Sequence, residues 1–269
     1  MVLSKLYIFF WRDWVEAKSY KVSFLLSFAT MGLPFVLMVF LGRLFDDVSI
    51  DALERYGGNY VAFAMVGLLV TSFAGTALNA FASSLRRAQI MGTLEVLIST
   101  KTSVPTMMFG WALYPFFRAT LSAVSVAIGG FLILGIAFDN VNVVGMLLIL
   151  VAMVVTMCSL GIMAASFTLV FKQGDPFTRL VTLASGLLSG MLFPVELMPT
   201  WLQYVANVLP HTYAIEGMRL ALLTGASTSE LLPALLVLTL YSVILVPLGF
   251  LVFGHSMVRA KKEGSLAHY

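Results

Sequence analysis

Long apolar runs separated by short polar segments make up most of this chain. Runs of about 20 or more apolar residues are long enough to cross the hydrocarbon core of a bilayer as helices. The runs are continuous and do not alternate every second residue, which disfavours a transmembrane β-barrel. The pattern therefore predicts an all-α, polytopic membrane protein with six transmembrane helices. These spans are expected at about residues 22–42, 60–82, 105–138, 143–171, 180–193 and 231–253.

Two further segments are neither spans nor ordinary loops. Residues 1–21 mix aromatic and basic side chains, which is typical of a helix lying in the membrane interface, although a cytosolic extension of the first span is the alternative. Residues 194–230 are too apolar for a solvated loop, and Pro194, Pro199 and Pro210 interrupt them too often for another span. We expect external re-entrant helices there, between spans five and six.

No internal repeat, low-complexity tract or soluble linker divides the chain, so residues 1–269 are expected to form a single transmembrane domain. Its expected parts are the interfacial helix at 1–21, spans one to five within 22–193, the external segment at 194–230, span six at 231–253 and a cytoplasmic tail at 254–269.

The composition agrees with a membrane protein. Hydrophobic residues make up 60% of the chain and charged residues only 11%, against about 25% charged residues in soluble domains. The net charge of +3 is too small to argue for nucleic-acid binding. Cys158 is the single cysteine, which excludes a disulfide within the chain and a zinc site built from cysteines.

The basic residues predict the orientation. With the N-terminus inside, 13 of the 16 Lys and Arg residues fall in cytoplasmic segments, and only Arg43, Arg55 and Arg219 lie outside. Arg118, well inside the third apolar run, is expected to snorkel to the cytoplasmic interface. The positive-inside rule therefore predicts a multi-pass protein of the inner or plasma membrane, with both termini in the cytoplasm.

Sequence motifs for catalysis are absent. The chain has no Gly-x-x-x-x-Gly-Lys-Ser/Thr loop and no His-Glu-x-x-His pair, and His211, His255 and His268 lack the spacing of metal ligands. We therefore expect no enzyme activity, no cofactor and no metal in this chain. The centres of the spans lack Asp, Glu, Lys and His, which disfavours ion-coupled transport, although backbone carbonyls at broken helices remain an alternative sodium site.

Residues 84–100, between spans two and three, are predicted to form one amphipathic cytoplasmic helix. Its apolar residues recur at near-helical spacing, and its charged residues lie elsewhere on the circumference. The apolar set is Leu85, Ala88, Met91, Leu94 and Leu97 or Ile98, and the charged set is Arg86, Arg87 and Glu95. An interfacial loop helix and a docking surface for a partner protein explain this pattern equally well.

Residues 193–219 carry the other unusual pattern. Their aromatic and apolar residues suit the lining of an exit gate, while a structural plug or a dimer contact is the alternative. We also expect Glu196 or Glu216 to pair with Arg219, against the alternative that these side chains are simply solvated. The candidate gate or substrate-path residues are Phe193, Pro194, Glu196, Leu197, Trp201, Tyr204, Tyr213, Glu216 and Arg219.

These features together resemble the permease subunit of an ABC-2 type transporter, over essentially the whole chain. The residues that carry the resemblance are Gly92-Thr93-Leu94-Glu95 to Ser103 after the second span, Phe193-Pro194-Val195-Glu196-x-x-Pro199 closing the fifth, and Leu209-Pro210-His211-Thr212-Tyr213-Ala214 followed by Arg219. Each motif alone is weak, but their order across six predicted spans is fairly specific.

The resemblance implies a cytoplasmic coupling helix that docks on a separate ATPase subunit, and a complex of two permease and two ATPase chains. ATP and Mg would then be bound by the partner. A homodimer is expected, in contact with membrane lipid, and Gly186 and Gly190 at Gly-x-x-x-Gly spacing would permit close helix approach within or between protomers. The implied ATPase-coupling residues are Arg86, Arg87, Gly92, Thr93, Leu94, Glu95, Leu97 and Ile98.

The expected function is therefore ATP-driven export of a hydrophobic small molecule, such as a drug or antibiotic, or of a lipid-like cargo. The preference for such a cargo rests on Leu209-Pro210-His211-Thr212-Tyr213, at a place where polysaccharide exporters of this family commonly have an Asn-Pro-Leu-like run. Export of a lipid-linked polysaccharide, or a membrane assembly role without transport, remains the alternative.

Overall fold

A computed structural model of the chain describes residues 2–20, isolated positions between 22 and 40, and residues 51–100, 102–134, 140–171 and 176–262. The predicted first span at 22–42 lies almost entirely outside the described residues.

The described residues form helices and turns, with no strand among them. The N-terminal half contains α1 (Val2–Ser19), α3 (Asp51–Glu54), α4 (Tyr60–Ile90), α5 (Leu94–Ser99) and α6 (Val104–Leu134). The C-terminal half contains α7 (Val143–Phe171), α8 (Pro176–Leu188), the 3-10 turn η1 (Val195–Leu197), α9 (Thr200–Val208), α10 (Pro210–Arg219), the π-helical turn η2 (Leu220–Thr224) and α11 (Leu232–Lys262). The all-helical prediction is confirmed for this part of the chain.

Four helices, α4, α6, α7 and α11, are long and apolar enough to cross a membrane. They have 29 to 31 residues each, which makes them about 45 Å long and longer than the hydrocarbon core of a bilayer. Each matches one predicted span, and α7 matches its predicted bounds of 143–171. The fifth predicted span differs, because α8 has only 13 residues and would be about 20 Å long.

Helix α7 occupies the centre of the bundle, between α4 and α11, and α6 packs on the other side of α4. The buried side chains along these contacts are apolar, and they include Leu78, Met153 and Leu238. Large apolar side chains also cover the outside: Leu132 on α6 and Val243 on α11 are about two-thirds to three-quarters exposed. An apolar exterior on long helices is what contact with lipid requires.

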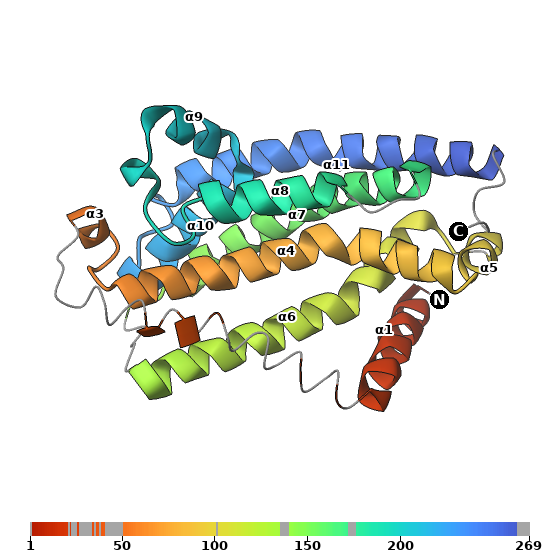
Figure 1. The fold of residues 1–269 in the computed structure, drawn as a ribbon, viewed down its shortest axis with the longest axis horizontal. Coiled ribbons are helices and arrows are strands. Elements are labelled where there is room, and N and C mark those ends of the chain that lie inside the picture. Colours follow the sequence, from red (N-terminus) through yellow and green to blue (C-terminus); the bar gives the residue numbers. More distant parts are fainter. Residues whose placement is uncertain are drawn as a thin grey trace.

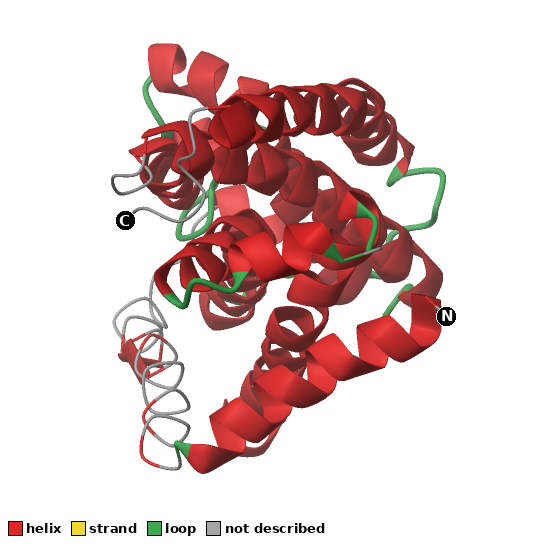
Figure 2. Ribbon diagram, turned by 90° about the vertical axis from the view of Figure 1, so that its right-hand side faces the viewer, coloured by secondary structure: helices red, strands yellow, loops and turns green. Residues whose placement is uncertain are grey.

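Helix α1 lies across the direction of the long helices rather than along it (Figures 1 and 2). Its aromatic residues hold it against α6, where the Phe10 and Phe117 rings meet edge to face at 5.4 Å. On its other face Tyr7 and Trp11 are more than half exposed and stack on each other. This orientation and this face are typical of a helix in the plane of a membrane interface.

The connections gather at two opposite ends of the bundle (Figure 1). Helices α3, α9 and α10 lie at one end, which we call the α9 end. Helix α5 and the last turns of α11 lie at the other, the α5 end, together with α1. Basic side chains such as Arg12, Arg87 and Lys262 belong to the α5 end, whose elements include the predicted cytoplasmic segments.

This arrangement predicts that the two ends are accessible from opposite sides of the membrane. In a Cys158→Ser background, Thr228→Cys is expected to react with a membrane-impermeant maleimide in intact cells, and Ser99→Cys only after permeabilisation. Both side chains are exposed, so burial does not limit the reaction. Labelling of both positions from one side would contradict the two-ended fold, and exchange of the two results would reverse the orientation.

Candidate functional site

The segment predicted as one helix over residues 84–100 is two helices in the structure. Helix α4 continues to Ile90, and Gly92 then adopts a left-handed conformation with φ of 66°, which glycine does without steric cost. The Gly92 N–H donates to the Gln89 carbonyl at 3.0 Å and the Thr93 N–H to the Ala88 carbonyl at 2.9 Å. This pair of bonds is the Schellman arrangement that ends a helix, so the single-helix prediction is wrong.

The residues predicted to contact an ATPase differ in their exposure. Leu94 is fully buried in the core cluster of the α5 end, where Leu85 and Trp111 also pack, so it anchors α5 instead of presenting a surface. Val96 is an exposed apolar residue of α5, with 64% of its surface accessible. Sequence reasoning missed it, because in one continuous helix Val96 would not lie on the predicted apolar face. Leu97 is partly buried.

Charged side chains connect this segment to α1. The Arg87 Nη1 atom lies 3.6 Å from Glu16 Oε2, and both side chains are partly exposed. A pocket of about 320 Å³ separates α1 from α4 and α5, and its lining includes Arg12, Arg87 and Trp111. The side chains of Glu95 and Ile98 lie outside the described residues.

At the α9 end, several elements meet at Arg219, the last residue of α10. Arg219 is buried, with only 3% of its surface exposed. Its Nε donates to the Phe63 carbonyl at 3.1 Å, Nη1 to the Gly190 carbonyl at 2.8 Å and Nη2 to the Met191 carbonyl at 2.8 Å. The guanidinium also lies 3.3 Å from the centre of the Phe63 ring. One side chain thus joins α10, α4 and the turn after α8, and we call these contacts the Arg219 clamp.

The expected pair between Arg219 and a carboxylate is wrong for the described residues. Glu216 and Glu196 face Arg55 instead, at 2.9 Å and 3.8 Å. Burial lowers the pKa of Arg219 to about 9, and Tyr56 and Glu216 partly offset this effect, so the guanidinium is charged at neutral pH. Its hydrogen-bond acceptors are backbone carbonyls, and the sequence of side chains does not show which carbonyls are available.

Most predicted gate residues lie on the surface of the α9 end. Trp201 is 66% exposed, Tyr204 72% and Leu197 56%. Tyr213 is partly buried and donates to the Asn207 carbonyl at 2.9 Å. Phe193 is also exposed, whereas Pro194 is buried. The exposed aromatic residues therefore cover the outside of this end, and they do not converge on one cavity within the described chain.

His211 belongs to the motif that carries the family resemblance, and the structure gives it a contact that the motif did not predict. The side chain is fully buried, and its Nε2 lies 3.0 Å from Thr71 Oγ1 on α4. Together with the Arg219 clamp, this contact fixes both the first and the last turn of α10 to α4.

Sequence reasoning also missed a polar face on α4. Ser72, Thr76, Asn79 and Ser83 recur at intervals of four, three and four residues, which places them on one side of the helix. Ser72, Asn79 and Ser83 are exposed although they lie in a helix long enough to span a membrane. We call these four residues the α4 polar face.

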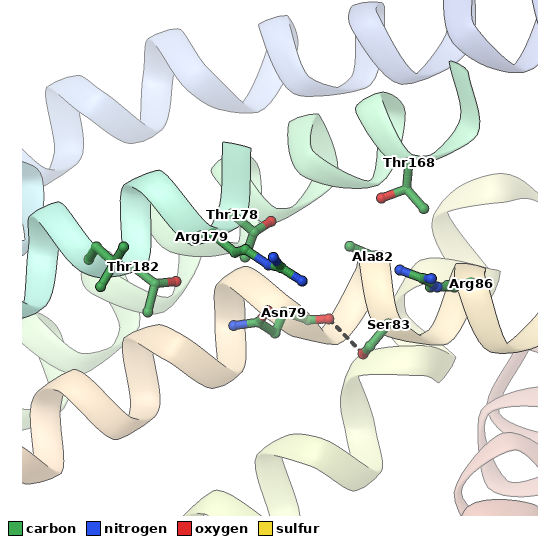
Figure 3. Close-up of a pocket in the computed structure, with 9 residues that line it drawn as sticks. Asn79, Ala82, Ser83, Arg86, Thr168, Thr178, Arg179 and Thr182 are labelled. Atoms are coloured by element: carbon green, nitrogen blue, oxygen red, sulfur yellow. Dashed lines mark hydrogen bonds between the residues drawn. The ribbon is translucent and has the colours of Figure 1, made fainter. Parts of the chain in front are cut away.

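A pocket flanks the α4 polar face on each side. Towards α8, a pocket of about 530 Å³ is lined by Asn79, Ser83 and Arg86 of α4 and by Arg179 and Thr182 of α8, among others. Figure 3 shows the Arg179 guanidinium reaching from α8 towards α4.

Towards α1 and α6, a second pocket of about 410 Å³ has Asp13, Arg87, Tyr114 and Arg118 in its lining. The two pockets share Asn79 and Ser83.

Replacing Arg219 with Gln is expected to lower the stability of the fold by about 3 kcal/mol, since charge-assisted hydrogen bonds to buried carbonyls are lost. The half-exposed Arg55 is the matched control, and Arg55→Gln should cost at most about 1 kcal/mol. The apparent Tm of the purified protein, measured at one scan rate, compares them. Equal shifts for the two variants would contradict the clamp.

Gly67 tests the same contact by size. A methyl group there would collide with the Met191 carbonyl oxygen and lie 2.6 Å from Arg219 Nη2, whereas at Gly75, on the same helix, it would meet nothing within 4 Å. Gly67→Ala is therefore expected to lower the apparent Tm, and Gly75→Ala to leave it unchanged or raise it, because alanine favours helix. A stable Gly67→Ala variant would show that the turn after α8 moves freely.

The chain matches the family model of the ABC-2 type transporter over residues 4–223. It is 29% identical over 204 residues to the transport permease ycf38 of Pyropia yezoensis, a match that covers 69% of this chain and 64% of the relative. It is 24% identical over 183 residues to the linearmycin resistance permease protein LnrN of Bacillus subtilis (strain 168), covering 68% of this chain and 44% of the relative. The matched regions therefore span less than two thirds of each relative. Because the family model matches well over half of its residues, the chain belongs to the ABC-2 type transporter family.

Proposed function

We propose that this chain is the permease subunit of an ATP-driven exporter, and that it moves a hydrophobic or lipid-like molecule out of the cytoplasm or the inner leaflet. The family match over residues 4–223 carries the proposal. A linearmycin resistance permease among the relatives supports an antibiotic-like cargo. A separate ATPase subunit would supply the energy, since the sequence contains no Gly-x-x-x-x-Gly-Lys-Ser/Thr loop.

The α4–α5 turn is the proposed contact with the ATPase. Val96 and the exposed Arg86 would lie against the partner, while buried Leu94 holds α5 to the bundle. An apolar contact surrounded by charged residues gives both affinity and a defined orientation. This surface belongs to the α5 end, which the basic residues assign to the cytoplasm.

Helix α4 would carry the movement across the membrane. It runs without a break for 31 residues, from Tyr60 to the proposed ATPase contact at Ile90. At its other end the Arg219 clamp and the contact between His211 and Thr71 attach α10. A displacement of α4 at the ATPase would therefore move α10 with it, and the segment from η1 to α10 would act as the exit gate.

The proposed assembly is a homodimer. Polar side chains on a membrane-spanning helix are costly when they face lipid, and a second copy placed over the α4 polar face would cover them. Leu180, Leu183 and Leu187 make a neighbouring exposed apolar strip on α8. Gly186 and Gly190 do not lie on one helix face as their Gly-x-x-x-Gly spacing predicted, because α8 ends at Leu188 and Gly190 has a φ of 78°.

Val96→Glu and Glu95→Lys are each expected to reduce co-purification with the partner ATPase subunit by about tenfold or more, since a proposed interface contact becomes a buried or reversed charge. Val205→Glu is the matched control, because Val205 is an exposed valine at the opposite end. Membrane insertion of all three variants is checked by the yield of the purified chain.

Retention of the ATPase by Val96→Glu would remove α5 from the interface. Loss of the ATPase from Val205→Glu as well would show that the loss comes from misfolding or charge in general. Failure of the unaltered chain to bind that ATPase or any other would contradict the proposed function itself.

A further inference from the structure

Two arginines flank the α4 polar face without an ion-pair partner among the described residues: Arg118 of α6 and Arg179 of α8. Each lines one of the two pockets that share Asn79 and Ser83. Arg118 is the fifteenth residue of the 31-residue α6, and its pocket reaches Ser72 near the middle of α4. The neighbouring Phe117 packs against Phe10 and Trp14 of α1, so Arg118 lies level with the helix that we place in the membrane interface.

Two other charges in the pocket beside α1 and α6 have partners. Asp13, which is buried, accepts hydrogen bonds from Arg12 at 2.9 Å and 2.7 Å. Arg87 faces Glu16 at 3.6 Å. In the pocket beside α8, no described lining residue is acidic, and Arg179 is part of the lining. Each pocket therefore presents one guanidinium group that has no ion-pair partner among the described residues.

A guanidinium group beside apolar surface is stabilised when an anion or water compensates its charge. Guanidinium groups bind phosphate and carboxylate oxygens through paired hydrogen bonds. The Thr182 hydroxyl and the second N–H of the Asn79 amide line the same space and can donate to the remaining oxygens. Exposed Leu183 at the edge of this pocket offers an apolar surface next to the charge.

We propose that the α4 polar face, with Arg118 and Arg179 on its two sides, binds the phosphate or carboxylate headgroup of an anionic amphiphile while the apolar tail stays in the membrane. This inference rests on the proposed function, because it names the class of cargo that the exporter would carry. A neutral cargo would leave both guanidinium groups uncompensated, and a cationic cargo would be repelled by them.

Native mass spectrometry of the purified full-length chain tests this directly, because it resolves each bound probe molecule. The first probe pair is phosphatidylglycerol and phosphatidylcholine with identical acyl chains. The second pair is stearate and methyl stearate. The first pair reports a membrane lipid as the source of the headgroup and the second a single-chain amphiphile, and a preference for the anionic member of either pair supports the proposal.

Arg118→Gln and Arg179→Gln are each expected to weaken binding of the anionic probe by about tenfold, as loss of a charge-assisted hydrogen bond requires. Arg118→Lys should retain most of the preference. Lys262→Gln removes a positive charge from the exposed end of α11, away from both pockets, and should have no effect.

Equal dissociation constants for the charged and uncharged probes with the unaltered chain would overturn the proposal, whatever the variants do. Equal weakening by Lys262→Gln would overturn it too, because the effect would then come from net charge. The measurement needs neither ATP nor the ATPase, so a negative result leaves the proposed permease function standing. Conversely, loss of the ATPase interaction would not change the binding result.

Discussion

The structure at the α9 end depends on a single desolvated cation that donates to three backbone carbonyls. Helix α8 ends at Leu188, so the carbonyls of Gly190 and Met191 have no helical N–H to pair with them, and an unpaired carbonyl in an apolar environment is costly. Arg219 supplies the donors for both, and the Phe63 ring lies against its charge. The guanidinium group and the carbonyls compensate each other's desolvation. We therefore expect the turn after α8 and the end of α10 to fold cooperatively.

The Arg219 clamp also connects the long α4 helix to α10, so α4 links the two ends of the bundle. One of its ends is held by Arg219 and the other terminates at Gly92, where the chain turns into α5. A helix without an internal break transmits displacement along its axis, because its hydrogen bonds hold successive turns together. In contrast, the Arg55 pairs with Glu196 and Glu216 are half-exposed and contribute little. They would break before the Arg219 clamp if the segment from η1 to α10 moved as the proposed exit gate.

Length and hydropathy were sufficient to predict the four long helices, because a run of apolar residues leaves few alternatives in a membrane. The break in residues 84–100 required a different signal: Gly92 was the residue to notice, since glycine commonly follows the end of a helix. The partners of Arg219 were beyond sequence reasoning, because the pattern of side chains says nothing about which carbonyls lack a donor. The α4 polar face could have been predicted, because Ser72, Thr76, Asn79 and Ser83 repeat at helical spacing.

The α4 polar face leaves several polar groups exposed within the described part of the chain. The apolar exterior of the bundle on α6 and α11 is satisfied by lipid, but lipid tails cannot satisfy Asn79, Arg118 and Arg179. Water, a second protomer or a charged ligand must cover these groups. Leucine side chains alone would form a purely apolar lipid-facing surface, as Leu180 and Leu183 do on α8. In the proposed function, the α4 polar face would be a surface that exchanges its partners, as a translocation path has to do.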